Sequence, residues 1–121
     1  MPYTTTTIEK LAIEVFLGVT AEERNKPQTV WFDLSWQCPI VPAGCYSDKI
    51  ADTHCYGTLS QLLIDYCKSN TFNLIEHLGW KCYEFCQTHL PPHTRIHLVV
   101  FKKPPIANLD RVSFEIRDHQ T

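Results

Sequence analysis

The stretch Thr58–Cys86, TLSQLLIDYCKSNTFNLIEHLGWKCYEFC, decides the fold. Its apolar residues recur every three or four positions in two successive runs, a spacing that predicts two consecutive helices. The first helix is expected from Thr58 to Lys68. The second is expected to start near Thr71, a residue type typical of N-caps, and to stop before Pro91 and Pro92. The apolar stripe of the second helix consists of Leu74, Ile75, Leu78, Cys82, Phe85 and Cys86.

Strand-like patterns lie on both sides of this helical segment. Before it, apolar and polar residues alternate along residues 30–38, VWFDLSWQC, and along residues 11–15, which precede Gly18. After it, the same alternation runs through residues 96–100 and 112–116. The predicted order is therefore ββααββ, an α+β fold with a four-stranded antiparallel sheet and both helices on one face. The two edges of such a small sheet are open to pairing, so we expect assembly with further copies of the chain.

Length and charge limit the class of protein. We interpret residues 1–121 as a single domain with a modest core. Lys and Arg total 11 against 13 Asp and Glu, and no basic stripe stands out, which argues against a nucleic-acid partner. No signal peptide or apolar run of transmembrane length is recognisable, so we expect no membrane association and a cytoplasmic location.

The six cysteines allow three interpretations. An even number would suit a disulfide framework, but the chain is longer than the usual disulfide-rich scaffolds. Cys67, Cys82 and Cys86 occupy apolar positions of the predicted helices, so we favour reduced thiols packed in the core. A zinc site that uses Cys82 and Cys86, four residues apart, is the alternative. Because CxxC, HxH and HExxH patterns are missing, we predict that no metal is bound.

Four short segments hold reactive side chains outside the apolar pattern. They are GVTAEERNKPQ (18–28), DTHCYG (52–57), IEHL (75–78) and VVFKKPP (99–105). Taken singly, each has a plain structural interpretation: a solvated acidic turn, a half-buried tyrosine, a carboxylate that complements a helix dipole, and lysines that guard a strand end. Glu76 is the least ordinary. Its apolar neighbours imply partial burial, and an unpaired buried carboxylate is costly.

Together, in their order and spacing, these segments resemble the dihydroneopterin aldolase family over Ile8–Arg117. DKIADTHCYGTL (48–59) is similar to the family's D-x-(I/V)-x-D-T-x-x-Y segment, and FNLIEHLG (72–79) to its F-x-L-(I/L)-E-x-(L/V)-A segment. VFKKPPIA (100–107) is similar to its V-x-K-P segment, although the paired lysines and Gly79 depart from the pattern. The resemblance implies a tunnelling fold (T-fold), in which four subunits close their sheets into a barrel and two such rings stack into an octamer.

The resemblance implies a retro-aldol reaction of folate biosynthesis. 7,8-Dihydroneopterin would yield 6-hydroxymethyl-7,8-dihydropterin and glycolaldehyde, with 2′-epimerisation as an accompanying activity. The C6=N5 imine of the pterin takes up the electrons, so neither a metal, nor another cofactor, nor a lysine Schiff base is required. The alternatives are a dihydroneopterin triphosphate 2′-epimerase, for which no extra basic cluster is apparent, and a non-catalytic pterin-binding module. A zinc-dependent pyruvoyl-tetrahydropterin synthase is disfavoured by the missing histidine set.

The resemblance also implies which residues hold the substrate. The 2-amino group and the adjacent ring nitrogen of a pterin present two parallel donors, which the carboxylate of Glu76 would accept in a fork. Ile75, Cys55 and His54 are the other expected substrate contacts. Because the family's active sites lie between subunits, we expect residues of two chains, in a tetramer or octamer, to share one site.

Three residues are expected to take part in the chemistry. Tyr56 corresponds to the family's active-site tyrosine and would return a proton to the substrate. Glu23 lies five residues after Gly18, as the family's acidic residue does, and would orient the side chain of the pterin. Lys103 directly precedes a proline and is the preferred lysine for proton transfer. Lys102 is the alternative, because some members carry an extra residue before their prolines.

Overall fold

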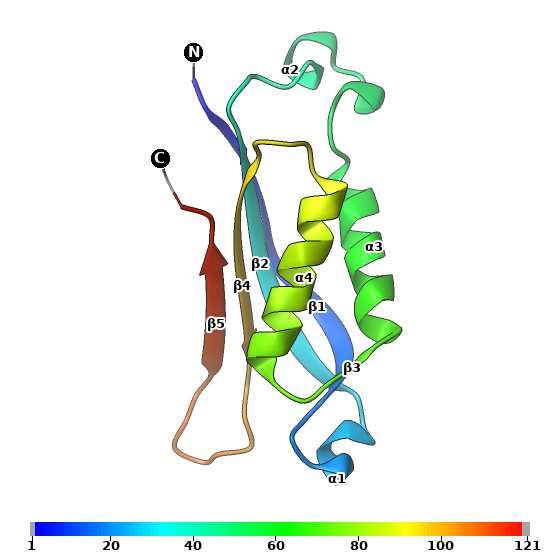
Figure 1. Cartoon of the computed structure of the whole chain (residues 1–121), viewed down its shortest axis with the longest axis vertical. Helices are drawn as coiled ribbons and strands as arrows, with labels where there is room; N and C mark the ends of the chain where they lie inside the picture. Colours follow the sequence, from blue (N-terminus) through cyan, green and yellow to red (C-terminus); the bar gives the residue numbers. More distant parts are fainter. Residues whose placement is uncertain (1, 120–121) are drawn as a thin grey trace.

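The computed structural model describes residues 2–119 and contains a sheet covered on one face by two long helices (Figure 1). The long strands β1 (Thr4–Leu17), β2 (Gln28–Cys38), β4 (Arg95–Lys102) and β5 (Val112–Arg117) pair antiparallel in the order β1-β2-β4-β5. The long helices are α3 (Tyr56–Lys68) and α4 (Ile75–His89). Short turns of helix, α1 (Ala21–Arg24), α2 (Gly44–Ser47) and η1 (Ile50–Asp52), lie in the connections. The predicted order of the long elements, ββααββ, is confirmed.

The prediction of a purely antiparallel, four-stranded sheet is wrong. A fifth strand, β3 (Thr71–Phe72), pairs in parallel with the end of β1, so the sheet is mixed and has the order β3-β1-β2-β4-β5. Thr71 is therefore an extended residue and not the N-cap of the second helix, which starts at Ile75. Phe72 is 3% exposed, and its carbonyl accepts the N–H of Gly18 at 3.0 Å. These two interactions hold the segment extended before the helix can start.

The core lies between the sheet and the two helices, as the alternating patterns predict. Every second residue of β2 from Val30 to Trp36 is buried, and each such large apolar side chain contributes roughly 1.5–3 kcal/mol. Three of the six thiols, which are all free, lie in this core. The facing residues of the helices are Leu59, Leu63, Cys67, Leu78, Cys82 and Cys86.

Helix α4 approaches the sheet most closely at Gly79. A Cβ on Gly79 would lie 2.7 Å from Cδ2 of Phe114 and 3.3 Å from Cγ1 of Val100. The departure from the family's alanine therefore has a packing reason, because any side chain here would push α4 away from β4 and β5. Within residues 2–119, no helix has the combination of length and apolar character that crossing a bilayer requires.

Candidate active site

Glu76 lies in the first turn of α4. Its side chain is exposed, so the predicted partial burial is wrong for the single chain; its neighbour Leu74 is itself 49% exposed. Within residues 2–119, the side chain of Glu76 forms neither a hydrogen bond nor an ion pair. The start of the helix favours a negative charge at this position. Glu76 is thus a charged acceptor that no described part of the chain uses.

The side chain of Glu76 lies toward the carboxyl end of β4. Glu76 precedes Gly79 by three residues, so the two lie on the same side of α4, one turn apart. Gly79 packs against Val100 of β4 and Phe114 of β5. Strand β4 runs antiparallel to α4 (Figure 1). Moving one turn from Gly79 toward the start of the helix, to Glu76, therefore means moving beyond Val100 toward the end of the strand.

Strand alternation separates the two candidate lysines at the end of β4. Leu98 and Val100 are fully buried on the helix-covered face, and Lys102 continues that row as the last residue of the strand. Lys102 is partly buried, whereas Lys103 follows the strand and is exposed. Neither lysine forms an ion pair with another described residue. Lys102 therefore lies on the same side and at the same end of the sheet as Glu76.

Glu23 lies at this end of the molecule too, on the short helix α1. The expected loop is an ordered helical turn: Glu23 N–H donates to Oγ1 of Thr20 at 3.1 Å, and Thr20 N–H donates to Oε1 of Glu23 at 3.3 Å. A Cβ on Gly18 would lie only 2.2 Å from Cβ of Glu23. The glycine is therefore required for α1 to fold back against the end of β1.

Tyr56, Cys55 and His54 lie at the opposite end of the helical layer. Tyr56 is the first residue of α3, and with 66% of its side chain exposed it is not half-buried. Helices α3 and α4 run in opposite directions, so the starts of the two helices are separated by about 20 Å, the length of the 13-residue α3 (Figure 1). One chain therefore does not bring Tyr56 to a small ligand held by Glu76.

A cavity of about 550 Å³ lies beside His54. Its lining is mostly apolar, and Oγ1 of Thr94, which is buried nearby, has no hydrogen-bond partner in the described chain. The sequence patterns did not reveal this cavity because its walls come from four separate connections and strand ends. They include Trp36, Cys38, Pro42, Thr53, Pro91 and Pro92.

The thiol of Cys55 differs chemically from the thiols of the core. Cys55 occupies the N-cap position of α3, where hydrogen bonds with the side chain and backbone of Thr58 lower the pKa of this thiol. In the core, a hydrogen bond with Cys67, at an Sγ–Sγ distance of 3.6 Å, and burial raise the pKa of Cys82. Burial raises the pKa of Cys86 to about 12. Among residues 2–119, no group of three or more side chains is arranged to hold a metal ion.

We expect iodoacetamide to alkylate Cys55 at a lower pH than it alkylates an ordinary thiol, because a larger share of Cys55 is thiolate. Cys82 and Cys86 should remain unlabelled in the folded protein, since burial disfavours their thiolates and excludes the reagent. Peptide mass mapping between about pH 6 and 9 measures both rates. Cys55→Ser is the control, and labelling of Cys86 as fast as that of Cys55 would contradict the expectation.

Comparison with known proteins identifies the family. The family model described as dihydroneopterin aldolase matches residues 6–117. The chain belongs to the dihydroneopterin aldolase family. The Methylorubrum extorquens dihydroneopterin aldolase is 31% identical over 111 residues, 90% of this chain and 85% of that one. A Chlamydia trachomatis chain named "Probable dihydroneopterin aldolase" is 36% identical over 112 residues, 90% of each chain.

Solved dihydroneopterin aldolase structures have the same fold. The Escherichia coli dihydroneopterin aldolase in complex with neopterin has a TM-score of 0.84, with 96% of this chain and 99% of that one covered at 19% identity. A Burkholderia dihydroneopterin aldolase bound to guanine has a TM-score of 0.79, with 98% and 93% covered at 14% identity. The predicted α+β fold of the family is confirmed. Dihydroneopterin aldolase activity, a lyase reaction of the folate pathway, is the function that family membership assigns to this chain.

Proposed function

We propose that the chain cleaves 7,8-dihydroneopterin in a site that two subunits share. The proposal rests on the positions of the candidate residues, which form two groups at opposite ends of one chain. A second copy that places its Tyr56 end against the Glu76 end of the first would complete the site. The first group consists of Glu23, Ile75, Glu76, Lys102 and Lys103, and the second of His54, Cys55 and Tyr56.

Glu76 anchors the pterin ring in this proposal. Its carboxylate accepts the 2-amino group and the neighbouring ring N–H in a charge-assisted fork, which fixes the orientation of the ring in its plane. Ile75 is the first residue of α4, and its backbone N–H is among those without a partner within the helix. This N–H is available to the ring carbonyl, since helix starts favour electron-rich groups.

The reaction breaks the bond between C1′ and C2′ of the side chain. Removal of the proton from the 2′ hydroxyl forms the carbonyl of glycolaldehyde, and the bonding electrons pass through C1′ into the C6=N5 imine. The resulting enamine then takes up a proton at C1′, which yields 6-hydroxymethyl-7,8-dihydropterin. The pterin is its own electron sink, so the reaction requires neither a metal nor a Schiff base. A lysine, through water, and Tyr56 of the neighbouring subunit move the protons, and Glu23 orients the side chain.

The lysine is Lys102 in this proposal. The V-x-K-P pattern favours Lys103, but Lys102 continues the alternating row of Leu98 and Val100, at the end of β4 that lies near the start of α4 (Figure 1). Lys102 is also the more buried of the two. Because Lys103 follows the end of the strand and is exposed, its side chain has no such fixed direction.

Closure into a ring of subunits would bring the two groups of residues together. The edge strands β3 and β5 have free outer edges in the single chain, and such edges favour pairing with another chain. On the face without helices, Trp31 stacks on Phe101 at 5.9 Å, so that face is partly apolar. These features support the proposed tetramer or octamer, which would act in the cytoplasm.

Complementation of two inactive variants tests the shared site. Glu76→Ala removes a residue of the first group, and Tyr56→Phe alters a residue of the second, so each variant alone should be nearly inactive. When the two variants are co-expressed in equal amounts, their subunits should pair at random, and about a quarter of the sites should contain both native residues. Activity should then return to about a quarter of the wild-type value. Product analysis for glycolaldehyde measures it. Activity no higher than the average of the two separate variants would refute the shared site.

A further inference from the structure

Four cations lie around the end of β4, at the border of the sheet face that the helices leave uncovered. A hollow of about 280 Å³ is lined by residues from three parts of the chain: Lys10, Trp31, Phe101, Lys102, Lys103, Asp110 and Arg111. Along the sequence no basic cluster is apparent, because only Lys102 and Lys103 are adjacent. The pairing of β1 with β2, of β2 with β4 and of β4 with β5 brings the others beside them.

The positive charge of this hollow is poorly compensated. In the described part of the chain, none of the four cations forms an ion pair, and Asp110 is the single carboxylate in the lining. The carboxylate of Asp33 is close by, but it accepts the backbone N–H of Lys10, at 2.8 Å, and not the ammonium. Four positive charges against one negative leave a local excess of three, in a chain whose formal charge is −2.

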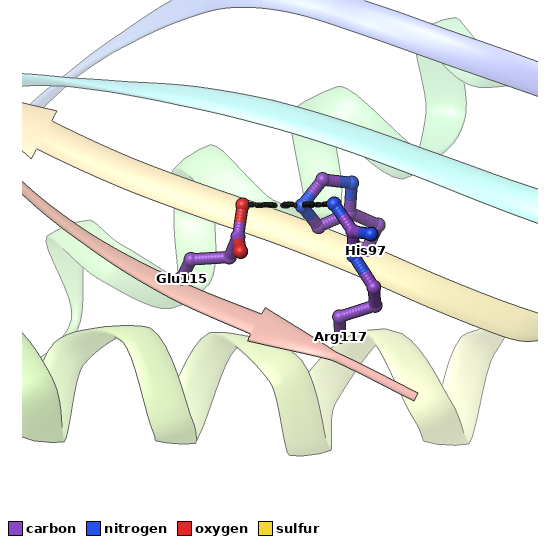
Figure 2. A network of polar contacts seen from close by, with 3 residues as sticks. All are labelled: His97, Glu115 and Arg117. Carbon is purple, nitrogen blue, oxygen red and sulfur yellow. Dashed lines mark hydrogen bonds and ion pairs between the residues drawn. The ribbon is translucent and has the colours of Figure 1, made fainter. Parts of the chain in front are cut away.

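The same face shows a contrasting, compensated group farther along β4 and β5. Figure 2 shows His97, Glu115 and Arg117, in which Oε2 of Glu115 lies 2.7 Å from Nε2 of His97 and 3.9 Å from the guanidinium of Arg117. The hydrogen bond with His97 lowers the pKa of Glu115, which keeps this carboxylate charged. Glu115 lies four positions along the chain from Arg111, about 13 Å in an extended strand, and it is already paired, so it does not neutralise the hollow.

The aromatic rings of the hollow hold one of the four cations, Arg111, in place. The guanidinium carbon of Arg111 lies 4.7 Å from the ring centre of Phe101, and Phe101 stacks on Trp31. This cation–π contact uses the flat face of the guanidinium and leaves the N–H groups at its edge free to donate. Arg111 is therefore held in place before any anion arrives, which reduces the ordering cost of binding.

We propose that this hollow binds an oligophosphate. Phosphate oxygens accept hydrogen bonds from lysine ammonium groups and from the edge of a guanidinium, which is the donor set that lines the hollow. Its volume is just below the roughly 300–1,000 Å³ of pockets that enclose drug-sized ligands, so it suits a phosphate chain and not a whole nucleotide. The site goes beyond the proposed aldolase reaction, whose substrate 7,8-dihydroneopterin carries no phosphate.

Titration calorimetry with sodium tripolyphosphate tests this site. The full chain should bind it, and Lys10→Gln with Arg111→Gln should weaken binding at least about tenfold, with a loss that shrinks as salt rises. The matched control is Lys49→Gln with Arg117→Gln, which removes one lysine and one arginine outside the hollow. This control should bind with the wild-type affinity, within about twofold. Adenosine triphosphate serves as an esterified probe: its phosphate chain would enter the hollow while the nucleoside stays outside, so the double variant should lose as much affinity for it as for tripolyphosphate.

Three results would overturn the proposal: no tripolyphosphate binding by the wild type, equal losses in both double variants, or a loss confined to adenosine triphosphate. The aldolase proposal is tested separately, because neither Lys10 nor Arg111 belongs to the proposed catalytic group. Cleavage of 7,8-dihydroneopterin should therefore be unchanged in Lys10→Gln with Arg111→Gln. Normal cleavage without tripolyphosphate binding would overturn the oligophosphate site alone.

Discussion

Replacing Glu76 by alanine should abolish pterin binding, and with it turnover. Each hydrogen bond to a charged group contributes about 1.5–3 kcal/mol, so losing a fork of two should weaken affinity by roughly 10²–10⁴-fold. Glu76 has no partner among residues 2–119, so its removal should leave the free energy of unfolding within about 0.5 kcal/mol of the wild-type value. Fluorescence titration with neopterin and urea unfolding measure the two effects.

Glu84→Ala is the matched control for this prediction. Glu84 lies on the same helix, where it forms an exposed ion pair with Lys81 at 3.3 Å, and exposed pairs contribute little. The control variant should bind neopterin like the wild type. If the Glu76→Ala variant also retained the wild-type affinity, the pterin ring would have to bind elsewhere, and the proposed anchor would be refuted.

The second large effect is expected from the lysine at the end of β4. Lys102→Ala should lower kcat by about 10²–10⁴-fold, the usual contribution of a positioned acid or base, because it removes the proton-transfer group on the side of Glu76. Neopterin affinity should change much less, since Glu76 holds the ring. Single-turnover measurements separate the chemical step from binding.

Lys103→Ala is the comparison that makes this prediction decisive. It removes the same charge one residue farther along the chain, after the strand has ended. We expect it to retain most of the wild-type kcat. A large loss in Lys103→Ala with near-normal turnover in Lys102→Ala would show that the motif, and not the strand alternation, identifies the lysine.

Long periodic segments of this fold were predictable from the sequence, and short or non-local pairings were not. The alternation of β2 identified its buried face because a half-buried strand has a strict period of two. The two-residue β3 has no period, and its pairing partner in β1 lies more than fifty residues earlier. At Thr71 a local N-cap preference therefore conflicted with the burial of Phe72, and burial decided the structure.

The candidate site was predictable as a set of residues but not as an arrangement. Apolar neighbours suggested that Glu76 is partly buried, yet Leu74 is itself exposed in the single chain. The distance between Tyr56 and Glu76 depends on the antiparallel course of α3 and α4, which short motifs do not encode. The basic hollow was missed for a similar reason, since Lys10 and Arg111 meet only through the pairing of strands.

The opposed directions of α3 and α4 have a consequence for how copies must associate. Under the shared-site proposal, every subunit gives Tyr56 to one neighbour and takes the tyrosine of the other, a head-to-tail relation. An open row of such subunits always ends in one unused donor and one unused acceptor. A closed ring has no ends, so ring closure itself would complete the last site.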